Sequence, residues 1–334
     1  MKNNLFIICF AILCFLLPSN LAAQRRFKLF QKVDSIMDLR QQKSKLDTNY
    51  VSRPDRYWTL RLINNISGTN FTLKGVDDEG ENVNFKFKDP LRHTITIGAN
   101  YRGLAVSLAF NPSNLFGKKT STEINVNAYG NRFGLDFIYE NNGEFKGEAD
   151  WGGDIYDLET EIREKSLTIN AYYAFNGRKF SYPAAFSQSY VQKRSAGSLM
   201  AGLSYHRTSV FIKEDEGVVY EADDIRKIKL SYVSAGLGYG YNFVPHRSWL
   251  IHLSTLPTIV FWRDNKVIKM VGVESMTSTF PEIAIVGRFS LVHYFKHFFM
   301  GLTMVYNYTS AGDYDVFRLR HNKWRARIII GKRF

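Results

Sequence analysis

The sequence predicts an all-β protein. The expected fold is an antiparallel transmembrane β-barrel of about twelve strands, with ten or fourteen as alternatives, after a short N-terminal helical or extended segment. The 334 residues include 26 Phe, 19 Tyr, 5 Trp and 24 Gly but only 8 Pro, which favours strands over helices. Apolar residues alternate with polar or small ones over segments of about ten residues, and acidic residues gather in alternate connections between these segments.

Residues 1–23 are expected to be a secretory signal peptide. A short basic start at 1–4 precedes an unbroken apolar run at 5–17, and small residues close the segment before Gln24. The apolar run is too short for a membrane-spanning helix. Both cysteines, Cys9 and Cys14, lie in this leader, so the mature chain would contain no disulfide, catalytic thiol or thiolate metal ligand.

Residues 24–56 are expected to form a periplasmic N-terminal extension, and residues 57–334 the barrel. Apolar residues of the extension recur at roughly helical spacing, from Phe27 to Met37, among many basic residues. The extension is a short helix that docks on the barrel, a contact for a partner, or a poorly packed linker between the leader and the first strand. After Tyr57 the apolar spacing changes from helical to alternating.

Twelve segments show the alternation expected of barrel strands. In 94–102, for example, Ile95, Ile97 and Ala99 alternate with polar or small residues. The twelve expected strands cover 57–66, 94–102, 104–111, 124–129, 133–139, 167–175, 199–207, 233–243, 249–261, 283–291, 298–308 and 324–334. An even number of strands returns the C-terminus to the side of the N-terminus, which places both termini in the periplasm.

The connections alternate between short and long, as in outer-membrane barrels. Short connections fall at 102–103, 130–131, 245–247 and 295–297, and long ones near 67–92, 112–121, 141–165, 209–229, 263–281 and 310–322. The stretches 74–90, 140–165 and 213–226 hold 20 of the 31 acidic residues and only 8 of the 44 basic ones. A soluble sandwich has no reason to sort charge by alternate connections, so this pattern favours acidic outer loops.

Aromatic residues near the expected strand ends, such as Tyr101, Trp249 and Trp324, are typical of the girdles at the two membrane interfaces. The competing interpretation is the aromatic core of a soluble sandwich. The terminal Phe334 ends a strand, as in barrels delivered to an insertion machine. The expected location is therefore the outer membrane, and the expected partners are its lipid, lipopolysaccharide and the barrel-insertion machinery.

Three stretches carry a family resemblance: GLAVSLAFNPSNLFG at 103–117, YGNRFG at 129–134 and FSYPAAFSQSY at 180–190. They resemble a family of exported proteins from Bacteroidota catalogued as domain of unknown function 4421. The resemblance runs from about residue 47 to the end of the chain. It implies an outer-membrane setting but brings no established activity and no catalytic residues.

The alternation assigns polar and charged side chains to the barrel lumen. The candidate lumen-lining residues are Arg102, Arg132, Asp136, His206, His252, Arg288, Arg325 and Arg327. One hypothesis is a narrow, porin-like channel for small anionic solutes, lined by the arginines. The alternative pairs Arg102 and Arg132 with Asp136, Glu140 and Glu123, which gives a closed barrel acting as a structural or interaction module through its acidic outer loops.

The segment 177–197 interrupts the order of connections, because 21 residues stand where a tight turn is due. It is basic and aromatic, and its candidate gate or plug residues are Phe180, Tyr182, Pro183, Phe186 and Tyr190. The other interpretation is an ordinary periplasmic loop or a short helix against the rim.

An outer-membrane lipid hydrolase is the third hypothesis, and no catalytic residue is assigned. Two His and Ser pairs, His252 with Ser254 and His206 with Ser204, lie two residues apart on expected strands. That spacing is about 7 Å, which predicts side chains too far apart for direct proton transfer. The acidic run at 150–161 lacks the pattern of a Ca²⁺ loop. Neither a metal, a cofactor nor a nucleic acid is expected.

Overall fold

The structure is a computed structural model that describes most of the chain after residue 45. The described residues are 46–76, 82–89, 91–101, 104–112, 121–151, 153–212, 225–275, 282–312 and 317–334, together with Gln31, Ser35 and Leu39. The chain divides into two units, Met1–Lys45 and Leu46–Phe334. In the first unit the three described residues are helical, and the expected leader lies outside the described residues.

Each of the twelve predicted strands overlaps one long strand of the second unit. These strands are β2 (Trp58–Val76), β4 (Arg92–Tyr101), β5 (Leu104–Phe110), β6 (Ser121–Tyr129), β7 (Phe133–Trp151), β8 (Asp154–Ala174), β10 (Ala196–Ile212), β11 (Ile225–Phe243), β12 (Trp249–Arg263), β15 (Ile283–Tyr294), β16 (Phe298–Gly312) and β17 (Phe317–Arg333). The prediction of an all-β antiparallel barrel with twelve principal strands is confirmed.

Shorter elements lie in segments predicted as connections. They are β1 (Val51–Ser52), β3 (Asn82–Lys88), α4 (Tyr182–Phe186), β9 (Val191–Gln192), β13 (Lys266–Lys269) and β14 (Val273–Ser275). The expected outer loop at 141–165 is mostly strand, because β7 and β8 continue to a tight turn at Gly153, whose φ is +101°. In this extension Phe145 and Ile162 are buried in the interior, so it lacks the apolar outer face that marks a membrane-spanning strand, although the backbone ladder continues.

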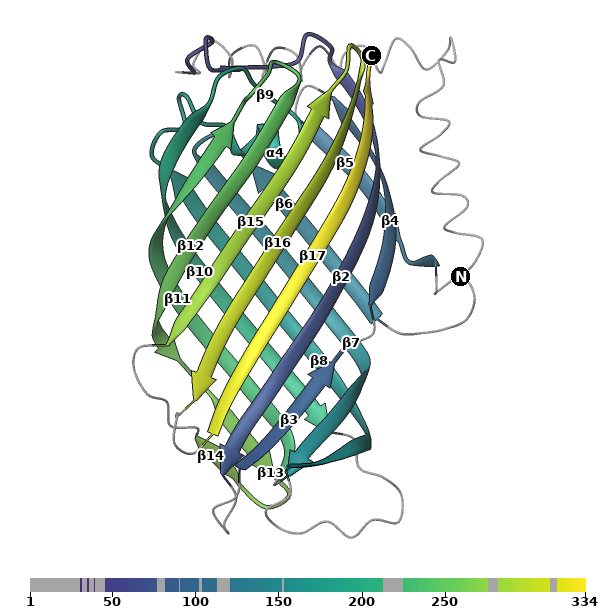
Figure 1. Ribbon diagram of the computed structural model, residues 1–334, viewed down its shortest axis with the longest axis vertical. Coiled ribbons are helices and arrows are strands. Elements are labelled where there is room, and N and C mark those ends of the chain that lie inside the picture. The colour runs from purple at the N-terminus through teal and green to yellow at the C-terminus, as the bar shows by residue number, and fades with distance from the viewer. Residues whose placement is uncertain are drawn as a thin grey trace. The chain divides into compact units, whose positions relative to one another are not determined.

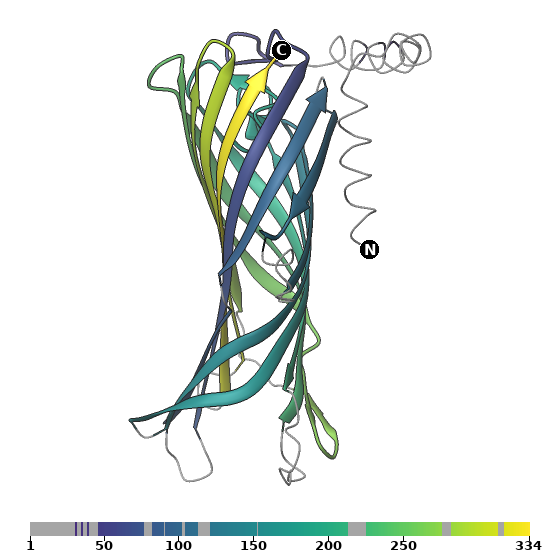
Figure 2. The same cartoon turned by 90° about the vertical axis from the view of Figure 1, so that its right-hand side faces the viewer.

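Antiparallel ladders join the strands into a ring (Figure 1). We call the end that holds Phe334 and α4 the C-terminal end, and the opposite end the far end. At the far end the closed ring runs β2-β3-β7-β8-β10-β11-β12-β15-β16-β17, with β17 returning to β2. Towards the C-terminal end β4 and β5 extend the sheet from β2, and β6 extends it from β7. Figure 2 shows the long teal strands β7 and β8 curving away at the far end.

The burial pattern is the reverse of that in a soluble protein. On β16, Met300, Leu302 and Met304 are 48%, 41% and 42% exposed, whereas Thr303 between them is 2% exposed. On β12, Leu253 is 66% exposed and His252 is 0% exposed. On these strands apolar side chains therefore cover the outside of the ring and polar ones face its interior, opposite to the usual distribution.

None of the helical segments within the described residues has the length and hydropathy needed to span a membrane.

Candidate functional site in the barrel interior

Most of the predicted lumen residues lie inside the ring. The side chains of Asp136, His206, His252, Arg288 and Arg325 are buried, and that of Arg327 is half-buried. Two of the predicted residues are not among those found inside the ring. Arg102 lies outside the described residues, and Arg132 lies with an exposed side chain in the turn between β6 and β7. The assignment of Arg132 to the lumen was wrong because alternation sets the face of a side chain only within a strand.

The segment 177–197, which we call the plug segment, enters the barrel at its C-terminal end. The helix α4 contacts β6 on one side of the ring and the paired strands β12 and β15 on another. Ser181 caps the helix by accepting a hydrogen bond from the Ala184 N–H at 3.3 Å, and Pro183 occupies the first turn. All five α4 residues and Phe180 are buried, whereas Tyr190 is half-buried.

Side chains of the barrel wall hold the backbone carbonyls of α4 and of the two residues after it. These contacts run from Tyr294 Oη to Ala184 (3.1 Å), Ser290 Oγ to Ala185 (2.8 Å), Arg61 Nη1 to Ser187 (3.1 Å) and Arg333 Nη2 to Gln188 (2.9 Å). The last carbonyls of a helix have no partner within the helix, so the wall supplies the donors that they need.

Residues 46–52, which we call the strap, bind the plug segment from outside. The strap strand β1 pairs with β9, and the Lys193 N–H donates to the Tyr50 carbonyl at 2.7 Å. The buried Gln192 amide links both parts: its Oε1 accepts from the Ser181 N–H at 3.0 Å, and its Nε2 donates to the Lys179 carbonyl at 2.6 Å and to the Tyr50 carbonyl of the strap at 3.3 Å. The two ends of the plug segment are thereby fixed independently of α4.

A buried ion pair lies beyond the plug segment. Arg288 on β15 pairs with Asp136 on β7, and Tyr129 Oη donates to Asp136 Oδ1 at 2.7 Å. The Arg288 guanidinium also lies 5.4 Å and 5.6 Å from the ring centres of Tyr172 and Tyr182. This arrangement compensates the buried charges in the way that a low-dielectric interior requires.

A larger charge cluster follows towards the far end and is centred on the fully buried Glu140. Its carboxylate pairs with Lys323 and lies 3.5 Å from both Arg92 Nη1 and Arg325 Nη2, and Arg325 also pairs with Glu123. The predicted acids Asp136, Glu140 and Glu123 are thus paired, but with bases other than the predicted Arg102 and Arg132. Arg92 and Lys323 were missed because each lies just before its predicted strand, 94–102 or 324–334, whereas the observed strands β4 and β17 begin earlier.

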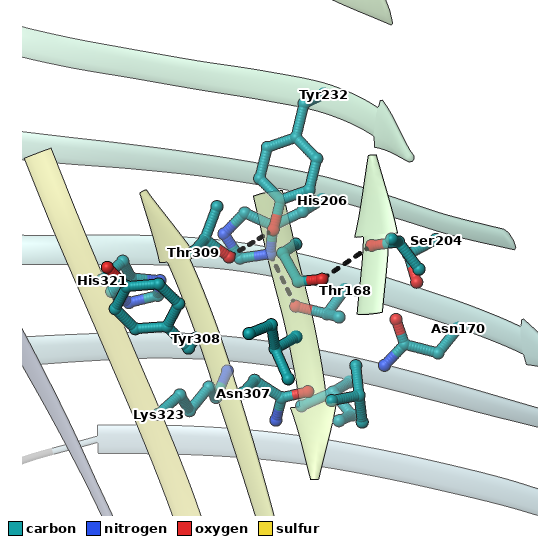
Figure 3. Close-up of a pocket in the computed structure, with 15 residues that line it drawn as sticks. Thr168, Asn170, Ser204, His206, Tyr232, Asn307, Tyr308, Thr309, His321 and Lys323 are labelled. Carbon is teal, nitrogen blue, oxygen red and sulfur yellow. Dashed lines mark hydrogen bonds between the residues drawn. The ribbon is translucent and has the colours of Figure 1, made fainter. Parts of the chain in front are cut away.

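His206 lies in the next layer, beside a cavity of about 30 Å³ (Figure 3). Its Nδ1 lies 2.8 Å from Thr168 Oγ1 and its Nε2 lies 2.6 Å from Thr208 Oγ1. A cavity of this size holds about one water molecule. An apolar cluster that includes Phe71, Phe87 and Phe145 fills the interior at the far end.

His252 contacts Ser254, which corrects the prediction that the two side chains are too far apart. His252 Nε2 lies 2.9 Å from Ser254 Oγ, and its Nδ1 lies 2.7 Å from Oδ1 of Asn242. Asn242 is directly opposite His252 in the β11–β12 ladder. The Cα atoms of two residues that are two apart on a strand are separated by about 7 Å. The His252 imidazole is long enough to reach the Ser254 hydroxyl across that distance. Among the described residues no group of three or more His, Cys, Asp or Glu could hold a metal ion.

Comparison with solved structures finds bacterial outer-membrane proteins. The outer membrane protease OmpT from Escherichia coli is 9% identical, with 85% of this chain and 98% of that chain covered and a TM-score of 0.43. The translocator domain of the autotransporter NalP from Neisseria meningitidis is 12% identical, with 91% of this chain and 98% of that chain covered and a TM-score of 0.33. The outer membrane protein OprG from Pseudomonas aeruginosa is 10% identical, with 84% of this chain and 97% of that chain covered and a TM-score of 0.29. These likenesses carry no information about activity.

The comparison with curated proteins finds no match. A family model matches residues 45–334, which is most of the chain. The chain therefore belongs to the family described as Domain of unknown function (DUF4421).

Proposed function

We propose that this protein is a β-barrel of the outer membrane, with lipid against its outer face and both termini in the periplasm. The support comes from the reversed burial pattern, in which Leu253 and Leu302 are exposed and His252 is enclosed. In a bilayer the hydrocarbon covers this apolar surface and removes it from water, whereas in aqueous solution the surface would stay exposed to water.

Replacing Leu302 with lysine tests this membrane setting. Leu302 is 41% exposed on β16, and a lysine near the bilayer midplane costs about 2–4 kcal/mol of folding free energy. The matched control is Val271→Lys, because Val271 is 75% exposed next to the β13–β14 turn, outside the proposed membrane belt. Equilibrium unfolding in phospholipid vesicles should show a loss for Leu302→Lys and almost none for Val271→Lys. Equal tolerance of the two changes would contradict the proposal.

We further propose a closed barrel that acts as a structural or interaction module through its acidic outer connections. The observation that carries this proposal is the filling of the lumen in successive layers. The buried α4, the Arg288–Asp136 pair, the Glu140 cluster and the apolar far-end cluster follow one another along the axis. A divalent cation that bridges the acidic connections to lipopolysaccharide phosphates would be one such contact.

Reconstitution in planar bilayers tests whether the barrel is closed. The expected result is a stable insertion without single-channel current, because the buried α4 and the paired charges beyond it lie across the lumen. Heat-denatured protein in the same detergent is the control for bilayer leakage. The other candidate, a narrow passage for small anions, is favoured by the arginines Arg61 and Arg333, which bind plug carbonyls rather than carboxylates. Anion-selective current steps would support that passage and overturn the closed barrel.

A further inference from the structure

The hydrogen bonds around His252 determine which of its nitrogens carries the proton. Asn242 Nδ2 donates to the Ser181 carbonyl and to Gln192 Oε1, both at 2.9 Å, so the Asn242 oxygen is the atom that faces His252. His252 Nδ1 must therefore be the donor in that contact, and Nε2 of the neutral ring is the acceptor. The Ser254 hydroxyl then donates to Nε2.

This order of atoms is that of a nucleophile, a general base and a residue that orients the base. From it we propose that Ser254, His252 and Asn242 form a hydrolytic site for fatty-acyl esters, which opens when α4 moves away. Ser254 is the nucleophile and His252 the general base, and Asn242 is a positioning residue. The inference goes beyond the proposed closed barrel, since it adds a chemical activity inside it.

The reaction balances with water as the only co-reactant. Ser254 Oγ forms a bond to the ester carbonyl carbon while its proton passes to His252 Nε2. Collapse of the tetrahedral intermediate breaks the bond to the leaving alkoxide, which takes the proton from His252. Water then attacks the acyl-serine with His252 again as base, and this step releases the carboxylic acid and restores the Ser254 hydroxyl.

Neighbouring groups supply charge and space for this reaction. Arg288, whose guanidinium pairs with Asp136, is directly opposite Ser254 in the β12–β15 ladder, so its positive charge would stabilise the oxyanion of the tetrahedral intermediate. On the other side Gly240 is opposite Ser254, and a Cβ there would lie only 3.2 Å from Ser254 Cβ and 3.1 Å from the Phe180 ring. A larger residue than glycine at 240 would crowd the nucleophile.

The helix α4 covers the site, and its removal would leave a chamber whose wall is part polar, as at Ser290 and Tyr294, and part apolar. The ring centres of Tyr182 and Phe186 each lie 5.1 Å from that of His252. Buried apolar side chains of the wall around α4 include Met200, Leu250 and Val292. A chamber lined by such side chains fits a fatty-acyl chain, which supports that substrate class.

The anchors of the plug segment hold Asn242 through contacts other than those that the wall makes with α4. Ser181 and Gln192, which hold Asn242, are fixed by other contacts, such as Ser181 Oγ to Asn131 Oδ1 at 2.6 Å. The wall binds α4 itself through hydrogen bonds from the Ser290 and Tyr294 hydroxyls to its carbonyls. The double variant Ser290→Ala/Tyr294→Phe therefore loosens α4 while it leaves the three site residues unchanged.

The test uses the full-length protein in detergent with an alkyl fluorophosphonate, which labels activated serines, and mass spectrometry to locate the label. We expect Ser254 to be labelled at least tenfold faster in the loosened variant than in the wild type. His252→Gln in the loosened background should slow the labelling at least a hundredfold. Asn242→Asp should move the pH of half-maximal labelling upward, because a carboxylate favours the protonated imidazole. The loosened variant should also hydrolyse 4-nitrophenyl palmitate, and Ser254→Ala should abolish that hydrolysis.

A second serine serves as the internal control. Ser204 is also buried two residues from a histidine, but the nitrogens of His206 contact Thr168 and Thr208 instead. Chymotryptic cleavage after Phe186 reports independently that α4 has become accessible. Absence of label on Ser254 in a variant that is cleaved there would overturn the inference, as would equal labelling of Ser204. Either failure leaves the bilayer conductance result unaffected, so the two proposals fail separately.

Discussion

Replacing Asp136 with alanine is expected to lower the free energy of unfolding of the barrel by about 3–5 kcal/mol. The substitution leaves Arg288 buried with the rings of Tyr172 and Tyr182 nearby but without its carboxylate. The Tyr129 hydroxyl loses its acceptor in the same step. An unpaired charge in the interior costs far more than the pair itself contributes, because the desolvation of the remaining ion is no longer offset.

Urea unfolding of the refolded protein in detergent, followed by tryptophan fluorescence and by gel mobility, measures this loss. Glu148→Ala is the matched control, since Glu148 lies 3.7 Å from Lys88 with both side chains largely in solvent. An exposed pair of this kind contributes about 0–1 kcal/mol. The double variant Asp136→Leu/Arg288→Met should recover most of the stability. A loss for Asp136→Ala as small as that for Glu148→Ala would refute the role of the pair.

The positions of the twelve long strands could be predicted because one of their faces is apolar and the other polar. On β12, Leu253 and Phe261 face outward and His252 and Ser254 face inward, and the sequence shows that difference directly. The far-end extensions of β7 and β8 were missed because their apolar residues, such as Phe145 and Ile162, are buried in the interior, so they lack the apolar outer face that marks the twelve strands. The strand β3 was missed for the same reason.

The contacts across the lumen could not be predicted from alternation. Asp136 and Arg288 are 152 residues apart, and their meeting depends on the order of strands around the ring. The contact between Asn242 and His252 depends on the register of the β11–β12 ladder. The plug segment was recognisable by its length, but its seating depends on single contacts such as Ser290 with Ala185.

Replacing Gln192 with alanine is expected to release the ends of the plug segment while the barrel remains folded. The change leaves the Ser181 N–H and the Lys179 and Arg194 carbonyls without their partner, and each unmade buried hydrogen bond costs about 1–3 kcal/mol. Local opening should become at least tenfold more frequent, so trypsin should cleave after Lys193 and Arg194 at least tenfold faster. Gln192→Glu keeps the acceptor oxygen for the Ser181 N–H and should give an intermediate rate.

Because the wall ladders do not involve Gln192, cleavage after Arg207 on β10 should stay as slow as in the wild type. If both regions became sensitive together, the plug segment and the barrel would open as one unit, and the separate anchoring of the plug ends would be disproved.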